Sequence, residues 1–182
     1  TGLSVLLLLA ILSTSAPSIA PYDPLAINLP EQLRPPDAEF LLGTDLLGRD
    51  MLSRLLYGGR TTLAIALFAV AVSLAVGVLL GLVAGFYGGL LDGLIMRFID
   101  MLLAFPRILL ALCVVALLGV GLANVMIAVG VAGISGYARV VRGAVLGAKE
   151  QGYVEAARVV GCRNYQIMLR HVLPNVVAPV IV

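Results

Sequence analysis

The sequence predicts an all-α protein, a polytopic transmembrane helical bundle, because it is far too apolar and too poor in charge for a soluble domain. Of its 182 residues, 61% are hydrophobic and 12% are charged, against roughly 45–50% and about 25% in typical soluble domains. The charged side chains gather in two clusters with long uncharged runs between them. A net charge of +2 without a basic stripe excludes the electrostatic footprint of a nucleic-acid-binding protein.

The gaps between charged residues mark the expected spans. No charged residue lies between Arg60 and Asp92, and about 20 apolar residues cross roughly 30 Å of hydrocarbon, so we expect a span over 61–86. A second uncharged gap begins after Arg107 and is broken by glycines at 119–121, which predicts a span over 123–141 and a preceding one over 94–118. The earlier of these two carries Arg97 and Asp100.

Arg97 and Asp100 are three residues apart, on one helical face. We expect them to form an intramembrane charge pair, since a cation and an anion in a membrane partly compensate each other. The alternative is that both reach the headgroup level separately.

The remaining chain divides around these spans. Residues 1–16 are expected to be a truncated first transmembrane helix, and 17–60 an extracytoplasmic loop with a short amphipathic helix over 50–57. Residues 61–182 form the transmembrane domain, which ends in an incomplete fifth span over 173–182. The 17–60 loop has four basic and six acidic residues, a net of −2, and segment 139–171 has six and two, a net of +4. The positive-inside rule therefore places the second segment, and with it the N-terminus, in the cytoplasm.

Small residues recur every four positions in the first long span, which lines them up on one helical face. They are Ser73, Gly77, Gly81, Gly85 and Gly89. Such a stripe lets two helix backbones approach closely in a membrane. We expect packing within the chain, with a subunit interface or the wall of a translocation path as the alternatives.

The second charged cluster contains two short amphipathic helices. One face of the first is shared by Tyr153, Ala156, Ala157 and Val160, and Gly161 ends this helix as a C-terminal glycine does. A second helical stretch, 165–171, then leads into Leu173-Pro174, and the segment 143–172 forms a knob between spans. The residues alone suit either a basic helix on anionic lipid or a surface for a protein partner.

Several motifs in this chain resemble one family. Glu155-Ala156-Ala157, three further residues, Gly161 and the later Leu173-Pro174 resemble the EAA loop of ABC importer permeases. The dipeptide, oligopeptide and nickel branch, DppC/OppC type, is similar to this chain in the segments RHVLPN, LGTDLLGRD, YGGRTTL and MRFIDMLLAFP. The resemblance implies the ABC importer permease fold of the six-span type, here truncated.

The resemblance also implies a function and a set of partners. The chain would help to form the translocation path of an ATP-driven importer in a bacterial or archaeal inner membrane, carrying di- or oligopeptides, nickel or related small solutes. The implied partners are a second permease subunit of the DppB/OppB type, two cytoplasmic ATP-binding subunits, an extracytoplasmic substrate-binding protein and membrane lipid, but no nucleic acid. The chain itself would be no enzyme and would bind no metal or cofactor, since ATP and Mg²⁺ belong to the ATPase subunits.

The same resemblance implies which residues contact the ATPase. These are Tyr153, Glu155, Ala156, Ala157 and Gly161: the alanines permit close approach, Glu155 pairs with a basic residue, and Gly161 permits the turn. The rival interpretation is an ion-coupled secondary transporter or channel without an ATPase, in which Arg97 and Asp100 serve an ion path.

Overall fold

A computed structural model describes residues 2–177. Within this range the regular secondary structure is helical, and the β-structure is limited to one isolated antiparallel bridge between Thr44 and Asp50. The last residues of the expected fifth span, 178–182, lie outside the described range. The chain divides into two compact units, Thr1–Ala66 and Leu67–Val182, which are described separately. The all-helical architecture predicted from the sequence is confirmed.

The first unit contains α1 (Gly2–Thr14), α2 (Ala16–Ile19), the short 3-10 helix η1 (Leu29–Glu31) and the beginning of α3 (Met51–Tyr87). Arg34 organises the loop between them. Its guanidinium pairs with Glu31 at 2.8 Å, Asp37 at 2.7 Å and Glu39 at 3.0 Å. It also lies over the ring of Phe40, 5.2 Å from the ring centroid. One cation thus ties together several turns of a proline-rich segment that no regular helix could order.

A second ion cluster precedes α3. The Asp45 carboxylate pairs with Arg49 at 2.8 Å and with Arg54. The neighbouring Asp50 is not part of this cluster, because it lies buried and accepts a hydrogen bond from the Ser53 N–H at 2.7 Å. This bond satisfies a free N–H in the first turn of α3, as capping carboxylates do.

The amphipathic helix expected over 50–57 is not separate, because α3 runs without interruption from Met51 to Tyr87. Two glycines cost a helix about 1 kcal/mol each relative to alanine, yet Gly58 and Gly59 both remain helical. A Cβ on Gly59 would collide with the side chain of Ser13 on α1, so this glycine lets two helices of the first unit approach. The short helix expected from the sequence is therefore the beginning of α3.

In the second unit, α3 packs against α6 (Leu122–Ala148) along the small-residue stripe. A Cβ on Gly77 would lie 2.6 Å from Cβ of Tyr137, one on Gly85 would lie 2.8 Å from Cβ of Val145, and one on Gly81 would collide with the Ala138 carbonyl. The Ser73 hydroxyl lies 2.6 Å from the Gly130 carbonyl oxygen.

Gly89 does not continue the stripe. The helix α3 ends at Tyr87, and Gly88 and Gly89 follow with φ of 67° and 58°, values that glycine adopts without steric cost. The chain therefore turns sharply here into α4 (Gly89–Ala104).

The span expected over 94–118 is bent. It consists of α4 and α5 (Arg107–Leu118), whose axes differ in direction by 96°. Pro106 causes the break, since it lacks an N–H and drives Phe105 to an extended conformation, φ −92° and ψ 136°. By length and apolar composition, α3 and α6 could each cross a membrane, and the α4–α5 pair could form a third span only as a bent unit.

Candidate functional site

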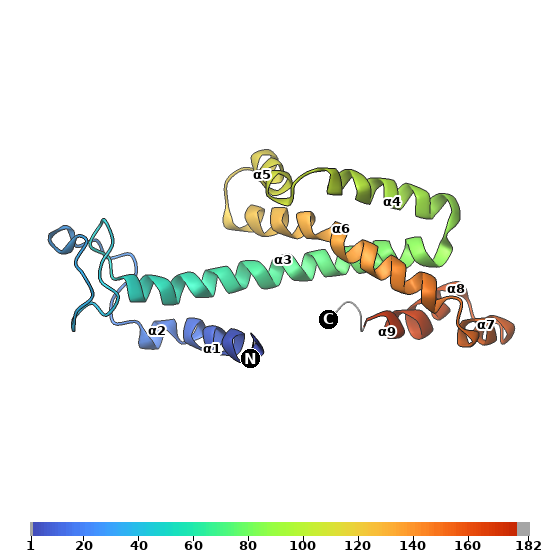
Figure 1. Cartoon of the computed structure of the whole chain (residues 1–182), viewed down its shortest axis with the longest axis horizontal. Coiled ribbons are helices and arrows are strands. Elements are labelled where there is room, and N and C mark those ends of the chain that lie inside the picture. Colours follow the sequence, from blue (N-terminus) through green and yellow to red (C-terminus); the bar gives the residue numbers. More distant parts are fainter. Residues whose placement is uncertain (1, 178–182) are drawn as a thin grey trace. The chain divides into compact units, whose positions relative to one another are not determined.

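The segment after α6 folds into a compact loop with two helical arms, one before Gly161 and one after it (Figure 1). We call residues 149–172 the coupling loop; it contains α7 (Gly152–Val159), α8 (Asn164–Gln166) and the π-helix η2 (Ile167–Val172), and it leads into α9 (Leu173–Val176). Gly161, with φ of 86°, closes α7. The Gly161 N–H donates to the Arg158 carbonyl and the Cys162 N–H to the Ala157 carbonyl, each at 3.0 Å. This is the hydrogen-bond pattern of a Schellman motif, which fixes the angle between the two arms.

The inner face of the coupling loop is apolar and buried. Val154 and Ala157 of α7 and Ile167 and Val172 of η2 belong to one hydrophobic cluster with the adjoining ends of α3 and α6. The helix ends contribute Leu82, Phe86, Val141 and Val145 to this cluster. The loop is therefore packed firmly against the two long helices. Because protein interiors are close-packed, they transmit strain from one element to the next.

The outer face carries most of the residues expected to contact an ATPase. Tyr153, Glu155, Ala156 and Gly161 are exposed. Ala157 differs, since it is only 9% exposed and packs inward beside Val154. The helical face proposed from the sequence is therefore divided between the core of this chain and its surface.

Two polar contacts hold the base of the coupling loop. The Arg142 guanidinium on α6 forms a bidentate pair with the Asp92 carboxylate on α4, at 2.5 and 2.6 Å. The Lys149 ammonium donates to the Gly85 carbonyl of α3 at 3.1 Å. Bidentate arginine–carboxylate pairs fix orientation as well as distance. The contacts tie the end of α6 to both α3 and α4.

The structure gives Asp100 a different partner from the one expected. Its carboxylate accepts a hydrogen bond from Arg139 on α6 at 2.6 Å, and no ion pair joins it to Arg97 within the described residues. A basic residue N-terminal to an acidic one opposes the helix dipole, so the pair within α4 is the weaker arrangement. Elsewhere in residues 2–177, no three His, Cys, Asp or Glu side chains gather into a group that could hold a metal ion.

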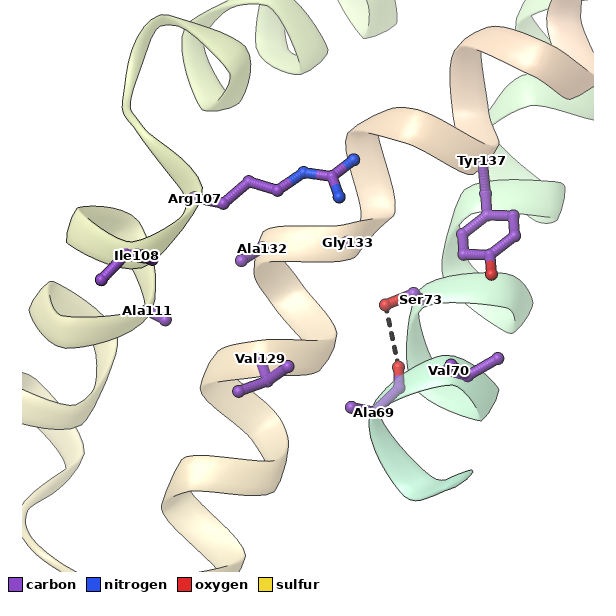
Figure 2. A pocket seen from close by; sticks show the side chains of 10 residues that line it. All are labelled: Ala69, Val70, Ser73, Arg107, Ile108, Ala111, Val129, Ala132, Gly133 and Tyr137. Atoms are coloured by element: carbon purple, nitrogen blue, oxygen red, sulfur yellow. Dashed lines mark hydrogen bonds between the residues drawn. The ribbon is translucent and has the colours of Figure 1, made fainter. Parts of the chain in front are cut away.

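A cavity of about 320 Å³ lies between α3, α5 and α6, beside the break at Pro106. Figure 2 shows Arg107 extending from the start of α5 toward α6. Ser73 and Tyr137 are the other polar side chains in the lining, which is otherwise formed by small and aliphatic residues. The Ser73 hydroxyl is already within hydrogen-bond distance of two carbonyl oxygens, those of Ala69 and Gly130.

The helical framework around these features matches a known family over residues 77–182, more than half of the chain. The family is described as the binding-protein-dependent transport system inner membrane component. The chain belongs to this family. The matched region contains the small-residue stripe from Gly77 onward, the bent α4–α5 pair and the coupling loop. Membership and the two long apolar helices together place the protein in a membrane.

Curated permeases resemble this family member along its whole length. It is 44% identical over 187 residues to the di/tripeptide transport system permease protein DppC of Pseudomonas aeruginosa, covering all of this chain and 62% of the relative. It is 46% identical over 183 residues to the glutathione transport system permease protein GsiD of Shigella flexneri, covering all of this chain and 60% of that relative. The chain thus spans about three fifths of the length of these relatives. The resemblance to peptide permeases read from the sequence motifs is confirmed.

Several residues of this family member escaped the sequence reasoning. Val159 is 83% exposed and adds apolar surface at the end of α7, next to Val160, which the sequence already placed on the face of Tyr153 and which is 82% exposed. The Asp92–Arg142 pair joins residues fifty positions apart. Val159 could have been found as an apolar residue next to Arg158, but nothing local in the sequence indicates the long-range pair.

Proposed function

We propose that this chain forms part of the translocation path of an ATP-driven importer and that its coupling loop contacts a cytoplasmic ATP-binding subunit. The two-faced coupling loop is the observation that carries the proposal. Its inner side is buried against α3 and α6, while its outer side exposes Tyr153, Val159 and Val160. A firmly packed loop with exposed apolar residues is suited to bind another protein and to follow its movement.

The proposed importer needs several partners. These are a second permease subunit, two ATP-binding subunits that hold ATP and Mg²⁺, an extracytoplasmic substrate-binding protein and membrane lipid. The net +4 charge of segment 139–171 supports a cytoplasmic position for the coupling loop. The N-terminus lies on the same side in this proposal.

The proposed cargo is a small peptide. Two relatives are named for the transport of di/tripeptides and of glutathione, which is itself a tripeptide. Both kinds of cargo carry a free terminal carboxylate. The similarity of 44–46% along the whole chain supports the same class of cargo here.

ATP would act on the path through the seated loop. Closure of the ATP-binding subunits would move the coupling loop, and the buried cluster would pass that movement to α3 and α6 as a rigid-body displacement. The binding protein would deliver the peptide to the opposite face. In this scheme the chain does no chemistry.

Introducing a charge on the outer face tests the proposal. We expect Val160→Glu, at an 82% exposed position, to leave folding intact and to lower ATP hydrolysis stimulated by the loaded binding protein by about tenfold, as loss of an interface hot spot does. The assay uses the complete importer in proteoliposomes. Leu46→Glu, the same kind of change at a 71% exposed position outside the loop, is the matched control.

Three outcomes would contradict the proposal. The first is full stimulation of ATP hydrolysis by the Val160→Glu importer. The second is uptake by the permease subunits alone under an ion gradient, without ATP-binding subunits, as the ion-coupled alternative requires. The third is an equal loss of stimulation in Val160→Glu and Leu46→Glu, which would deny the coupling loop a special role.

A further inference from the structure

The helices between residues 61 and 148, here called the helical layer, contain more cations than anions. Residues 61–148 include four arginines and two aspartates. Both aspartates are engaged, Asp92 by Arg142 and Asp100 by Arg139. The layer therefore has no carboxylate left for Arg97 or Arg107.

Arg107 differs from Arg97 in its surroundings. Both arginines are exposed, but the Arg107 side chain lines the open cavity of about 320 Å³ between α3, α5 and α6, and Figure 2 shows it reaching from α5 to α6. A Cβ on Gly136 would lie 3.2 Å from Nη2 of Arg107, so the glycine leaves room for the guanidinium beside α6. Within residues 2–177, Arg107 makes no ion pair and no side-chain hydrogen bond.

An unpaired cation in a segment that we expect to lie in the membrane calls for an anion from elsewhere. Ionisable side chains within membrane segments pair with one another or mark the route of a substrate. The break at Phe105-Pro106 has the same implication, since irregular backbone at membrane depth is tolerated where it lines a cavity or is covered by protein. The start of α5 also presents free N–H groups and the positive end of its dipole.

We propose that this cavity is a subsite for the carboxylate of the transported solute and that Arg107 pairs with it. The inference rests on the proposed import of small peptides and names the group by which they are recognised. A guanidinium matches a carboxylate through two parallel N–H···O bonds. The volume is at the small end of ligand cavities, which run from about 300 to 1,000 Å³, and so fits a terminal carboxylate with its neighbouring residue.

The test is photo-crosslinking of a dipeptide to the complete importer in nanodiscs of phosphatidylcholine. The dipeptide carries a photoreactive side chain, is added at high concentration without the binding protein, and is compared with its own C-terminal amide. We expect the free acid to label residues 107–111 or 129–137 and the amide to label them about tenfold less. This comparison uses the unmodified chain, so it does not depend on a variant's folding. Equal labelling by acid and amide would overturn the proposal.

Three variants assign the effect to one side chain. Arg107→Gln is expected to lower labelling by the free acid about tenfold, to the level of the amide. Arg107→Lys keeps the charge but loses the paired N–H donors, so it should keep part of the labelling. Arg97→Gln is the matched control, because Arg97 also lacks a carboxylate in its layer but does not line the cavity, and it should label like the unmodified chain. Unchanged labelling in Arg107→Gln, or an equal loss in Arg107→Lys, would overturn the proposal.

The source of the anion is tested by the lipid. Replacing a third of the phosphatidylcholine with phosphatidylglycerol should leave labelling unchanged if the cavity takes the solute carboxylate. A tenfold fall would show that a lipid headgroup occupies Arg107 and would overturn the assignment. ATP-driven uptake by the same importer in proteoliposomes is measured separately, so a failure of the proposed function appears there and a failure of the subsite appears in the labelling.

Discussion

The two charged regions of this chain use their charges in opposite ways. In residues 20–50, Arg34 binds three carboxylates of the same loop, and Asp45 is paired with both Arg49 and Arg54. In the coupling loop, all of which is described, Glu155 and Arg158 form no ion pair, and neither do Glu150, Arg163 and Arg170. The first region pairs most of its charges within the chain, whereas the second leaves its charges to solvent or to another molecule.

The coupling loop is held by apolar burial in place of ion pairs. Val154, Ile167 and Val172 are fully buried against the ends of α3 and α6. Burying one such side chain contributes roughly 1.5–3 kcal/mol, whereas an exposed ion pair contributes about 0–1 kcal/mol. A loop can therefore be firmly seated and still keep a charged outer face that is free to bind.

The largest effect should come from placing a charge in the seat of the coupling loop. Val154→Asp buries a carboxylate that no cation faces, which costs about 3–5 kcal/mol, and we expect residues 152–172 to become sensitive to limited proteolysis in the membrane. Val159→Asp, five residues along the same helix but 83% exposed, is the control. Equal protease resistance of the two variants would show that apolar burial does not hold the loop.

A smaller effect is expected at the turn between the two arms. Gly161→Val forces a β-branched residue into a left-handed conformation with φ of 86°, which costs roughly 1–2 kcal/mol for residues other than glycine. The added Cβ meets no atom within 4 Å, so strain alone acts. Gly161→Asn, whose side chain tolerates this conformation, should restore most of the thermal stability of the purified chain, measured as Tm. A Tm equal in all three proteins would mean that the turn is not stabilising.

The smallest effect should distinguish the charged loops by their response to acid. Burial opposes ionisation of Asp45, but the N–H groups of Arg49 and Leu47 and the Arg49 guanidinium outweigh it and lower the pKa to about 2 from 3.8. A lowered pKa means that this stabilisation is complete above about pH 4 and is lost as the pH falls toward 2.

Hydrogen exchange of residues 30–50, corrected for intrinsic rates, is the measurement for that response. We expect protection to fall between about pH 4 and 2 in this loop, in line with the lowered pKa of Asp45, and to stay constant over residues 152–172. Asp45→Asn should remove the part of this response that comes from Asp45 and leave a smaller one, because the N–H of Phe40 also lowers the pKa of Asp37 in this loop. A parallel acid response in both regions would remove the distinction between them.

Periodicity and charge gaps predict much of the fold because they report on single helices. The four-residue spacing of Gly77, Gly81 and Gly85 indicates a face that permits close approach, and that face does pack within the chain. It cannot name the partner helix, since the matching Tyr137 and Val145 are more than fifty residues away. The 96° bend at Pro106 was missed for a similar reason, because hydropathy measures the length of an apolar run and not its direction.

The candidate site shows the same boundary between local and distant information. The spacing of residues 153–160 indicates an amphipathic helix, but one sequence does not say which apolar residues face the chain's own core. Val154 and Ala157 do, while Val159 and Val160 face outward. The contact of Asp100 with Arg139 likewise depends on how α4 lies against α6, and the local rule of three-residue spacing points to Arg97.

The uninterrupted helix α6 connects the buried cluster under the coupling loop with the Arg107 cavity. Its later residues, Val141 and Val145, are embedded in the seat of the coupling loop, and its earlier residues, Val129 and Gly133, form a wall of the Arg107 cavity. At 1.5 Å per residue its 27 residues extend about 40 Å. Under the proposed function, a tilt of α6 imposed at the coupling loop would change the width of the cavity, because the helix is continuous between the two.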